Sequence, residues 1–167
     1  GLEVIEAHHL FGVDYGMIDV VLHQESIVHS MVESRDGGLY AYLSVTDMAL
    51  PIMNALMHPD KRVNPFGRVD LAGVGRLSFM APDENKFPAL RLCYRAGRAG
   101  ETLPAVLNGA NEVAVGLFLD NRIRFTDIVR TVERVMDEHV PVMNAGIEDI
   151  FRADAWARER AYIIARG

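Results

Sequence analysis

Cysteine and lysine are scarce in this sequence, and long hydrophobic runs are missing. Cys93 is the only cysteine among the 167 residues, which excludes an internal disulfide and any cysteine-rich metal site. Lysine occurs only at Lys61 and Lys86, and the other basic residues are arginines spread along the chain. The formal net charge is −6, so we expect no concentrated basic face of the kind that binds nucleic acid.

Signals for membranes and export are also missing. No apolar stretch approaches the ~20 residues that a membrane-spanning helix needs. The sequence does not open with a basic and then apolar leader. We therefore expect a soluble cytoplasmic protein with no membrane and no nucleic-acid partner.

The remaining composition is that of a globular protein, with 50% hydrophobic and 24% charged residues. In the first half, Ile18 to Leu22 has the composition of a short strand, and a β-hairpin is predicted from Ser26–Ser34 and Leu39–Val45. The turn between the two runs reads Arg-Asp-Gly-Gly, and glycine supplies the positive φ that a tight hairpin turn requires. A helix is predicted after Asp47, ending near Met57.

The second half predicts helices throughout. A helix is expected over Ala89–Ala99, a second after a cap at Thr102, a third after a cap at Thr126 and a last one after a cap at Asp154. Four short-looped amphipathic helices indicate a small bundle.

These patterns predict an α+β fold in three segments. Residues 1–57 are a mixed piece with a β-hairpin, residues 58–88 are a linker rich in proline and glycine with one short strand at 76–79, and residues 89–167 are an all-α four-helix bundle.

Few side chains point to chemistry when they are taken singly. Glu6 and His9 have the spacing that places a carboxylate and an imidazole on one helix face, which suits either a metal site or a solvated surface. His29 lies within a strand, where a hydrogen-bonded packing role is the simpler interpretation. On the polar side of an apolar helix, structural polar contacts are expected for Asn108, Asn111 and Glu112.

Several long motifs, taken together, resemble one family. They are Gly1–Phe11 (GLEVIEAHHLF), Ser26–Val32 (SIVHSMV), Asp47-Met48 with Leu50-Pro51-Ile52, and Thr102–Val115 (TLPAVLNGANEVAV), followed by Ile123–Ile128 and Asp154–Arg158. In order and spacing this chain is similar to the C-terminal portion of the 1-deoxy-D-xylulose-5-phosphate reductoisomerase family. The resemblance implies the end of a catalytic domain that carries the dimer sheet, followed by a linker and a C-terminal helical domain.

The resemblance also implies an activity. Members convert 1-deoxy-D-xylulose 5-phosphate to 2-C-methyl-D-erythritol 4-phosphate in non-mevalonate isoprenoid synthesis, as homodimers that use NADPH and Mg²⁺ or Mn²⁺. By this resemblance Glu3 matches the third metal-binding carboxylate, Met48 the methionine over the nicotinamide ring, and His29 a supporting histidine near the site. The other metal ligands, the phosphate-binding residues and the NADPH domain have no counterpart in the 167 residues, so a catalytically inactive fragment is expected.

Two short segments depart from the family pattern. The family usually has His-Pro-Gln-Ser where this chain has Gln24 and Glu25, and Pro-Asp-Met followed by a basic residue where it has Thr46 and Ala49. An alternative hypothesis is therefore a free-standing dimerisation or binding module without catalysis. A further alternative is a metal-dependent enzyme that uses Glu3, Glu6 and His9 alone.

Overall fold

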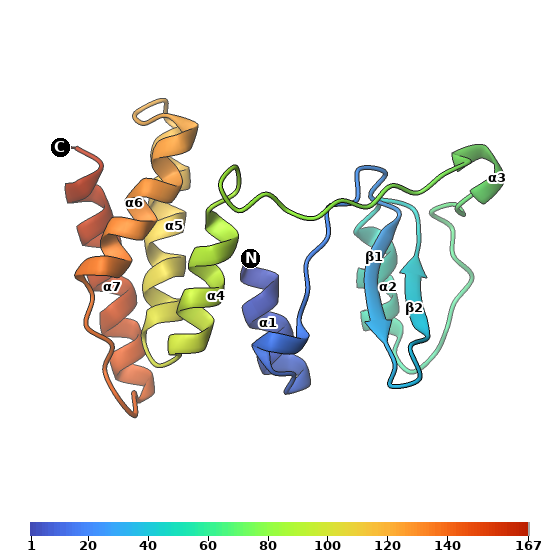
Figure 1. The fold of residues 1–167 in the computed structure, drawn as a ribbon, viewed down its shortest axis with the longest axis horizontal. Helices are drawn as coiled ribbons and strands as arrows, with labels where there is room; N and C mark the ends of the chain where they lie inside the picture. Colours follow the sequence, from blue (N-terminus) through green and yellow to red (C-terminus); the bar gives the residue numbers. More distant parts are fainter. Residues whose placement is uncertain (167) are drawn as a thin grey trace. The chain divides into compact units, whose positions relative to one another are not determined.

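Helices dominate the structure, a computed structural model that describes residues 1–166. Within this range one antiparallel sheet forms, with two strands, so the predicted combination of helices with a small sheet is confirmed (Figure 1). The helices are α1 (Leu2–Phe11), α2 (Ala49–Met57), α3 (Leu71–Val74), α4 (Ala89–Ala99), α5 (Leu103–Leu119), α6 (Phe125–Glu138) and α7 (Ile147–Ile164); the strands are β1 (Val28–Glu33) and β2 (Leu39–Leu43), and the 3-10 helix η1 spans Tyr15–Met17.

The chain forms two compact units. One contains Gly1–Asp19 together with the residues from Asp83 onward, and the other contains Val20–Pro82. The first unit therefore holds α1, η1 and α4 to α7, and the second holds the hairpin, α2 and α3.

Helix α5 is the centre of the first unit. It packs against α4, α6 and α7, while α1 packs on α4 (Figure 1). Its inward stripe recurs every three or four residues, as an amphipathic helix requires when several helices cover it. The buried members of this stripe are Leu103, Val106, Leu107, Gly109, Ala110, Val113, Ala114 and Leu117.

The predicted cap at Thr102 is only half right. Thr102 directly precedes α5, but its side chain makes no capping hydrogen bond to that helix. The hydroxyl oxygen instead accepts from the backbone N–H of Val142 at 3.1 Å and lies 2.7 Å from Nε2 of His139. A fully buried threonine thus connects the start of α5 to the segment after α6.

The other two predicted caps are wrong. Helix α6 begins at Phe125, and Asp127 accepts from the backbone N–H of Arg124, so Thr126 already lies inside the helix. Helix α7 is continuous through Asp154, and the carboxylate there accepts from Nε of Arg158 one turn later, at 2.8 Å. A partner at i+4 lets an aspartate remain in a helix interior instead of capping one.

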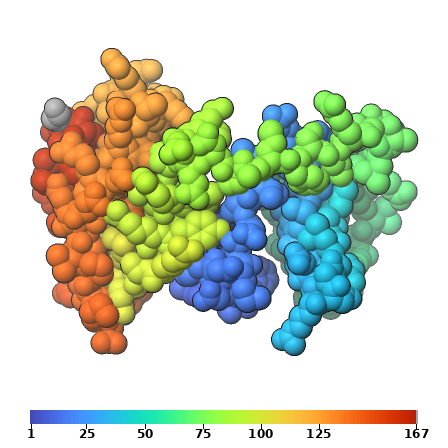
Figure 2. All heavy atoms as spheres, in the orientation of Figure 1, coloured from blue at the N-terminus to red at the C-terminus, as the bar shows by residue number. Residues whose placement is uncertain are grey.

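The β-hairpin that the Arg-Asp-Gly-Gly turn predicted is present in the second unit. Strands β1 and β2 pair antiparallel, with Val32 opposite Tyr40 and Met31 opposite Ala41. Gly37 has a φ of 83°, and Asp36 accepts from the N–H of Gly38 at 3.0 Å. The loop at the tip of the hairpin lies at the molecular surface (Figure 2).

Neither of the two other predicted strands forms. In their place Leu22 and Met80 make one isolated antiparallel bridge, with N–H to O distances of 2.8 and 2.9 Å in the two directions. The predicted linker also contains the four-residue helix α3, which Asp70 caps through the N–H of Ala72.

The two units divide the chain differently from the predicted segments 1–57, 58–88 and 89–167. Residues 1–19 group with the C-terminal helices because α1 and η1 pack on α4. The assignment of residues 1–57 to a catalytic domain stays a prediction. Within residues 1–166, none of the helices combines the length and apolar character needed to cross a bilayer.

Candidate functional site

Glu3 is the one predicted metal ligand, and it lies in the first turn of α1. The helix starts directly after Gly1, and the Glu3 side chain is exposed. A carboxylate in a first helical turn is favoured by the partial positive charge of the free N–H groups there. Glu3 is therefore a negatively charged oxygen donor on a rigid element.

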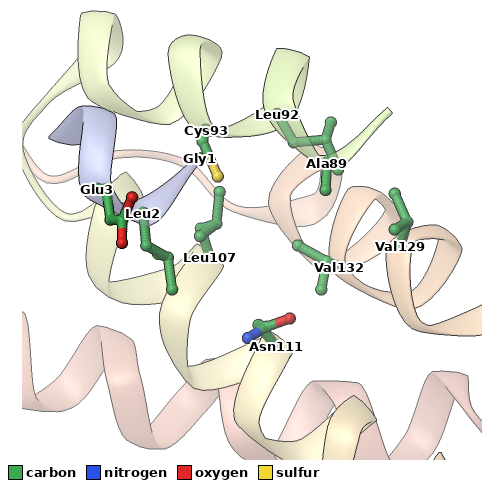
Figure 3. A pocket seen from close by; sticks show the side chains of 10 residues that line it. All are labelled: Gly1, Leu2, Glu3, Ala89, Leu92, Cys93, Leu107, Asn111, Val129 and Val132. Carbon is green, nitrogen blue, oxygen red and sulfur yellow. The ribbon is translucent and has the colours of Figure 1, made fainter. Parts of the chain in front are cut away.

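The same turn of α1 borders an open pocket of about 360 Å³, which residues of four helices of the first unit line (Figure 3). Apolar side chains form most of the wall, and Glu3 and Asn111 are its two side chains with strong polar groups. A pocket of this size with apolar walls and few polar groups has the make-up of a small-molecule or peptide site. The remaining lining residues are Gly1, Leu2, Ala89, Leu92, Cys93, Leu107, Val129 and Val132.

Gly1 lies against α4 so closely that a side chain there would not fit. A Cβ atom on Gly1 would lie 2.6 Å from Sγ and 2.9 Å from Cβ of Cys93. Cys93 is buried, and burial raises the pKa of its thiol. The Cys93 side chain is thus a packing group that sets how closely α1 approaches α4.

Asn111 differs from the two polar neighbours with which the sequence grouped it. Asn108 donates to Glu112 at 3.2 Å, and Glu112 pairs with Arg158 at 2.7 Å, so both make the structural contacts expected of them. The half-buried Asn111 makes no side-chain hydrogen bond within residues 1–166 and instead lines the pocket. The structural contact that the sequence predicted for Asn111 is therefore not made, because only the fold separates the two flanks of α5.

His29 lies at an irregularity of the hairpin. The register shifts between Val28 and Ser30, so His29 is the residue without a partner on β2. Its ring Nε2 lies 3.2 Å from the carbonyl oxygen of Ser44, and the residue is exposed. Bulges often redirect a side chain next to an active site, and this one frees His29 from the regular pairing.

Met48 is the predicted nicotinamide contact. It directly precedes α2, and 72% of its surface is exposed. Asp47 beside it accepts from the N–H of Ala49 at 2.8 Å, which fixes the start of the helix. Met48 therefore presents a free apolar side chain on a fixed backbone. His29 and Met48 belong to the second unit and Glu3 to the first.

The carboxylate introduced by Glu25 is held by Ser78, through its hydroxyl and its backbone N–H. Its carboxylate accepts from the N–H of Ser78 at 3.0 Å and from the Ser78 hydroxyl, and these bonds lower the pKa of Glu25 to about 2. Nδ1 of His23 lies 3.1 Å from the same carboxylate. Glu25, which stands where the family usually has glutamine, thus connects the segment before β1 to the segment that follows α3.

Thr46, another departure from the family pattern, also makes a hydrogen bond to a distant segment. Its hydroxyl donates to the carbonyl oxygen of Ser26 at 3.2 Å, and Ser26 itself has a positive φ of 53°. Nothing in the structure explains Gln24.

Glu3, Glu6 and His9 do not form a metal site by themselves. Across residues 1–166, no three side chains of histidine, cysteine, aspartate or glutamate come together in a way that could hold a metal ion. Glu3 fits Mg²⁺ as one hard oxygen ligand, and the described part of the chain supplies no complete set.

The fold and these residues can be compared with known proteins. The sequence profile described as the DXP reductoisomerase C-terminal domain matches residues 43–160. The chain belongs to the 1-deoxy-D-xylulose 5-phosphate reductoisomerase family. The resemblance on which Glu3, His29 and Met48 were selected is thereby confirmed, although the roles of these three residues stay predictions.

Curated reductoisomerases are similar over nearly the whole chain. The enzyme of a Synechococcus species is 51% identical over 166 residues, which cover 99% of this chain and 42% of that enzyme. The enzyme of Acetivibrio thermocellus is 51% identical over 159 residues, which cover 95% of this chain and 42% of that enzyme. The chain thus spans less than half the length of these reductoisomerases.

Solved reductoisomerase structures share the fold. The Zymomonas mobilis enzyme in complex with NADPH superimposes with a TM-score of 0.91 at 38% identity, covering 99% of this chain and 44% of that one. A reductoisomerase in complex with NADPH, fosmidomycin and magnesium gives 0.91 at 37% identity, covering 98% and 42%.

Proposed function

We propose that this chain is the C-terminal part of an NADPH- and divalent-metal-dependent reductoisomerase that converts 1-deoxy-D-xylulose 5-phosphate to 2-C-methyl-D-erythritol 4-phosphate. The observation that carries the proposal is the 51% identity to a curated reductoisomerase over 99% of the chain. Solved relatives with the same fold are complexes with NADPH and magnesium. The chain alone is inactive, because such a site needs ligands that residues 1–166 do not supply.

Glu3 is the metal ligand that this chain contributes. Its carboxylate is exposed in the first turn of α1, and it needs no rearrangement to give a hard oxygen to Mg²⁺ or Mn²⁺. The bound metal ion holds the substrate's oxygens and acts as a Lewis acid on the carbonyl during the skeletal rearrangement.

Met48 and His29 serve the reduction that follows. NADPH supplies the hydride that reduces the rearranged aldehyde. The exposed thioether of Met48 packs over the nicotinamide ring and excludes water from its face. His29 supports the site from the bulge of β1, with its ring held by the Ser44 carbonyl group.

The hairpin is the dimer contact of the proposed enzyme. A two-stranded sheet is marginally stable by itself, and its open edges are suited to pairing. Large apolar side chains on both strands are exposed, among them Val32, Leu39, Tyr40 and Tyr42. A homodimer that packs on these residues would cover them.

We assign the parts of the chain accordingly. Residues 1–57 form the end of the catalytic domain and residues 58–88 the linker. Residues 89–167 form the C-terminal four-helix bundle, as the packing of α4, α6 and α7 on α5 supports. The compartment proposed for the enzyme is the cytoplasm.

The test is NADPH oxidation with 1-deoxy-D-xylulose 5-phosphate and Mg²⁺, measured for the complete enzyme and for the 167-residue chain. We expect the complete enzyme to oxidise NADPH and the 167-residue chain not to do so. Oxidation by the isolated chain would contradict its dependence on further ligands. A natural protein of 18.6 kDa that dimerises without any activity would favour the alternative, a binding module of the same fold.

A further inference from the structure

A series of hydrogen bonds in the second unit joins the chain segments that carry His29 and Met48. The backbone N–H of Ser44 donates to the carbonyl oxygen of Ile27 at 3.1 Å, and the Ser44 carbonyl oxygen lies 3.2 Å from Nε2 of His29. One further bond continues this series toward Met48, and its donor is the side chain of Thr46. The two proposed site residues of this unit are therefore connected through the run that ends with Thr46.

The Thr46 bond fixes the chain just before Met48. The hydroxyl donates to the carbonyl oxygen of Ser26, which lies 20 residues earlier in the sequence, at 3.2 Å. Directly afterwards the backbone turns, because the N–H of Asp47 donates to the carbonyl oxygen of Val45 at 2.9 Å, and α2 starts after Met48. With Thr46 held, few positions are left for the backbone of Met48.

The acceptor of this bond has a backbone conformation that costs free energy. Ser26 has a positive φ of 53°, which residues other than glycine rarely adopt. Such conformations persist only where surrounding contacts hold them, and they are frequent at functional sites. Here the N–H of Ser26 donates to the carbonyl oxygen of His23 at 3.3 Å, and the preceding Glu25 accepts from the N–H of Ser78 at 3.0 Å. The carbonyl group that Thr46 contacts is thus held from its other side.

We propose that Thr46 is a positioning residue for the reduction step, and that its hydrogen bond to Ser26 holds Met48 where the nicotinamide ring packs. The inference rests on the function proposed above. A methionine side chain has three rotatable bonds, so a fixed backbone reduces the freedom that is lost when the cofactor binds. Thr46 acts through Met48 and needs no contact of its own with the cofactor.

The experiment compares variants of the complete enzyme. Thr46→Val replaces the hydroxyl by a methyl group of similar size, and Thr46→Ser keeps the hydroxyl. Thr126→Val makes the same change at an exposed threonine of α6, in the other unit. Met48→Ala, alone and combined with Thr46→Val, shows whether Thr46 acts through Met48.

Three readouts separate positioning from a general effect on structure. They are the methyl NMR resonance of Met48 without cofactor, the NADPH affinity by fluorescence titration, and the KM for the sugar phosphate. Because Thr46 is exposed, its substitution should leave the midpoint of thermal unfolding near the wild-type value.

For Thr46→Val we expect a shifted Met48 resonance, an unchanged KM for the sugar phosphate and an NADPH affinity weakened about three- to tenfold, as for the loss of one ordinary hydrogen bond. Thr46→Ser and Thr126→Val should behave like the wild type. In the Met48→Ala background, Thr46→Val should weaken NADPH binding no further.

Two results would overturn the proposal. Additive losses of affinity in the double variant would show that Thr46 acts without Met48. An unchanged Met48 resonance and NADPH affinity in Thr46→Val, or an equal loss in Thr46→Ser, would show that the hydroxyl positions nothing. A wild-type enzyme that binds no NADPH would instead refute the proposed function, while the Met48 resonance would still test the role of the Thr46 bond.

Discussion

Glu112 on α5 and Arg158 on α7 form an ion pair in which Oε2 and Nη2 lie 2.7 Å apart. Arg158 also donates from Nε to Asp154 at 2.8 Å, so one guanidinium connects two carboxylates on two helices. The hydrogen bond from Arg158, together with that from Asn108, lowers the pKa of Glu112. The arrangement joins the two helices that share the largest contact in the first unit.

Arg158→Ala should lower the midpoint of thermal unfolding by a few degrees, because it breaks the contacts to both carboxylates. Arg152→Ala is the matched control, since the Arg152 side chain is 76% exposed and pairs with Asp149 within its own helix. Differential scanning calorimetry of the two variants tests this. If both variants lowered the midpoint equally, the contact between α5 and α7 would contribute no more to stability than an ion pair within one helix.

Leu117→Ala should reduce the free energy of unfolding by about 2–5 kcal/mol, because it removes a core side chain and leaves a cavity. Leu117 is 4% exposed on α5, while Leu119 on the same helix is 70% exposed. Leu119→Ala should change the free energy of unfolding by less than about 0.5 kcal/mol. Urea denaturation measures both, and similar losses for the two leucines would contradict the position of the core.

The Glu25–Ser78 contact predicts a pH dependence. Because the pKa of Glu25 is about 2 in the folded protein and 4.5 in the unfolded reference, its stabilisation is present above pH 4.5 and is lost as the pH falls toward 2. Ser78→Ala removes the hydroxyl donor and should move this pKa back toward 4.5. An NMR titration of the Glu25 carboxyl group checks the shift. Ser30→Ala, at an exposed serine of β1, should leave it unchanged.

The contact between Gly1 and Cys93 predicts a compensating pair of substitutions. In the complete enzyme, Gly1→Ala should weaken metal affinity, since the new Cβ would lie 2.6 Å from the Cys93 sulfur and displace the turn that carries Glu3. Cys93→Ala should restore part of the loss by removing that sulfur. Mn²⁺ titrations of the single and double variants measure the coupling. Strictly additive effects would show that the two residues do not constrain each other.

The sequence correctly predicted two elements that are set by neighbouring residues, a hairpin turn and the start of a helix. The hairpin follows from the Arg-Asp-Gly-Gly turn, where Gly37 adopts the positive φ expected of it. The start of α2 follows from Asp47, which accepts from the N–H of Ala49 as a capping residue does.

Features that depend on distant contacts were missed. The grouping of α1 with α4 and the pocket at Asn111 arise from packing between segments about ninety residues apart. Periodicity shows that a residue lies on a helix face, and only the fold shows what that face meets.

Two neighbouring carboxylates of α1 test the central claim most directly. Glu3→Gln and Glu6→Gln each remove one charge from an exposed position of this helix, and only Glu3 borders the pocket. The measurement is kcat for NADPH oxidation with 1-deoxy-D-xylulose 5-phosphate and Mg²⁺ by the two variants of the complete enzyme, with circular dichroism to verify the fold. Glu3→Gln should lower kcat by orders of magnitude with the fold intact, and Glu6→Gln should keep it near the wild-type rate. A wild-type rate for Glu3→Gln would contradict the metal-binding role of Glu3.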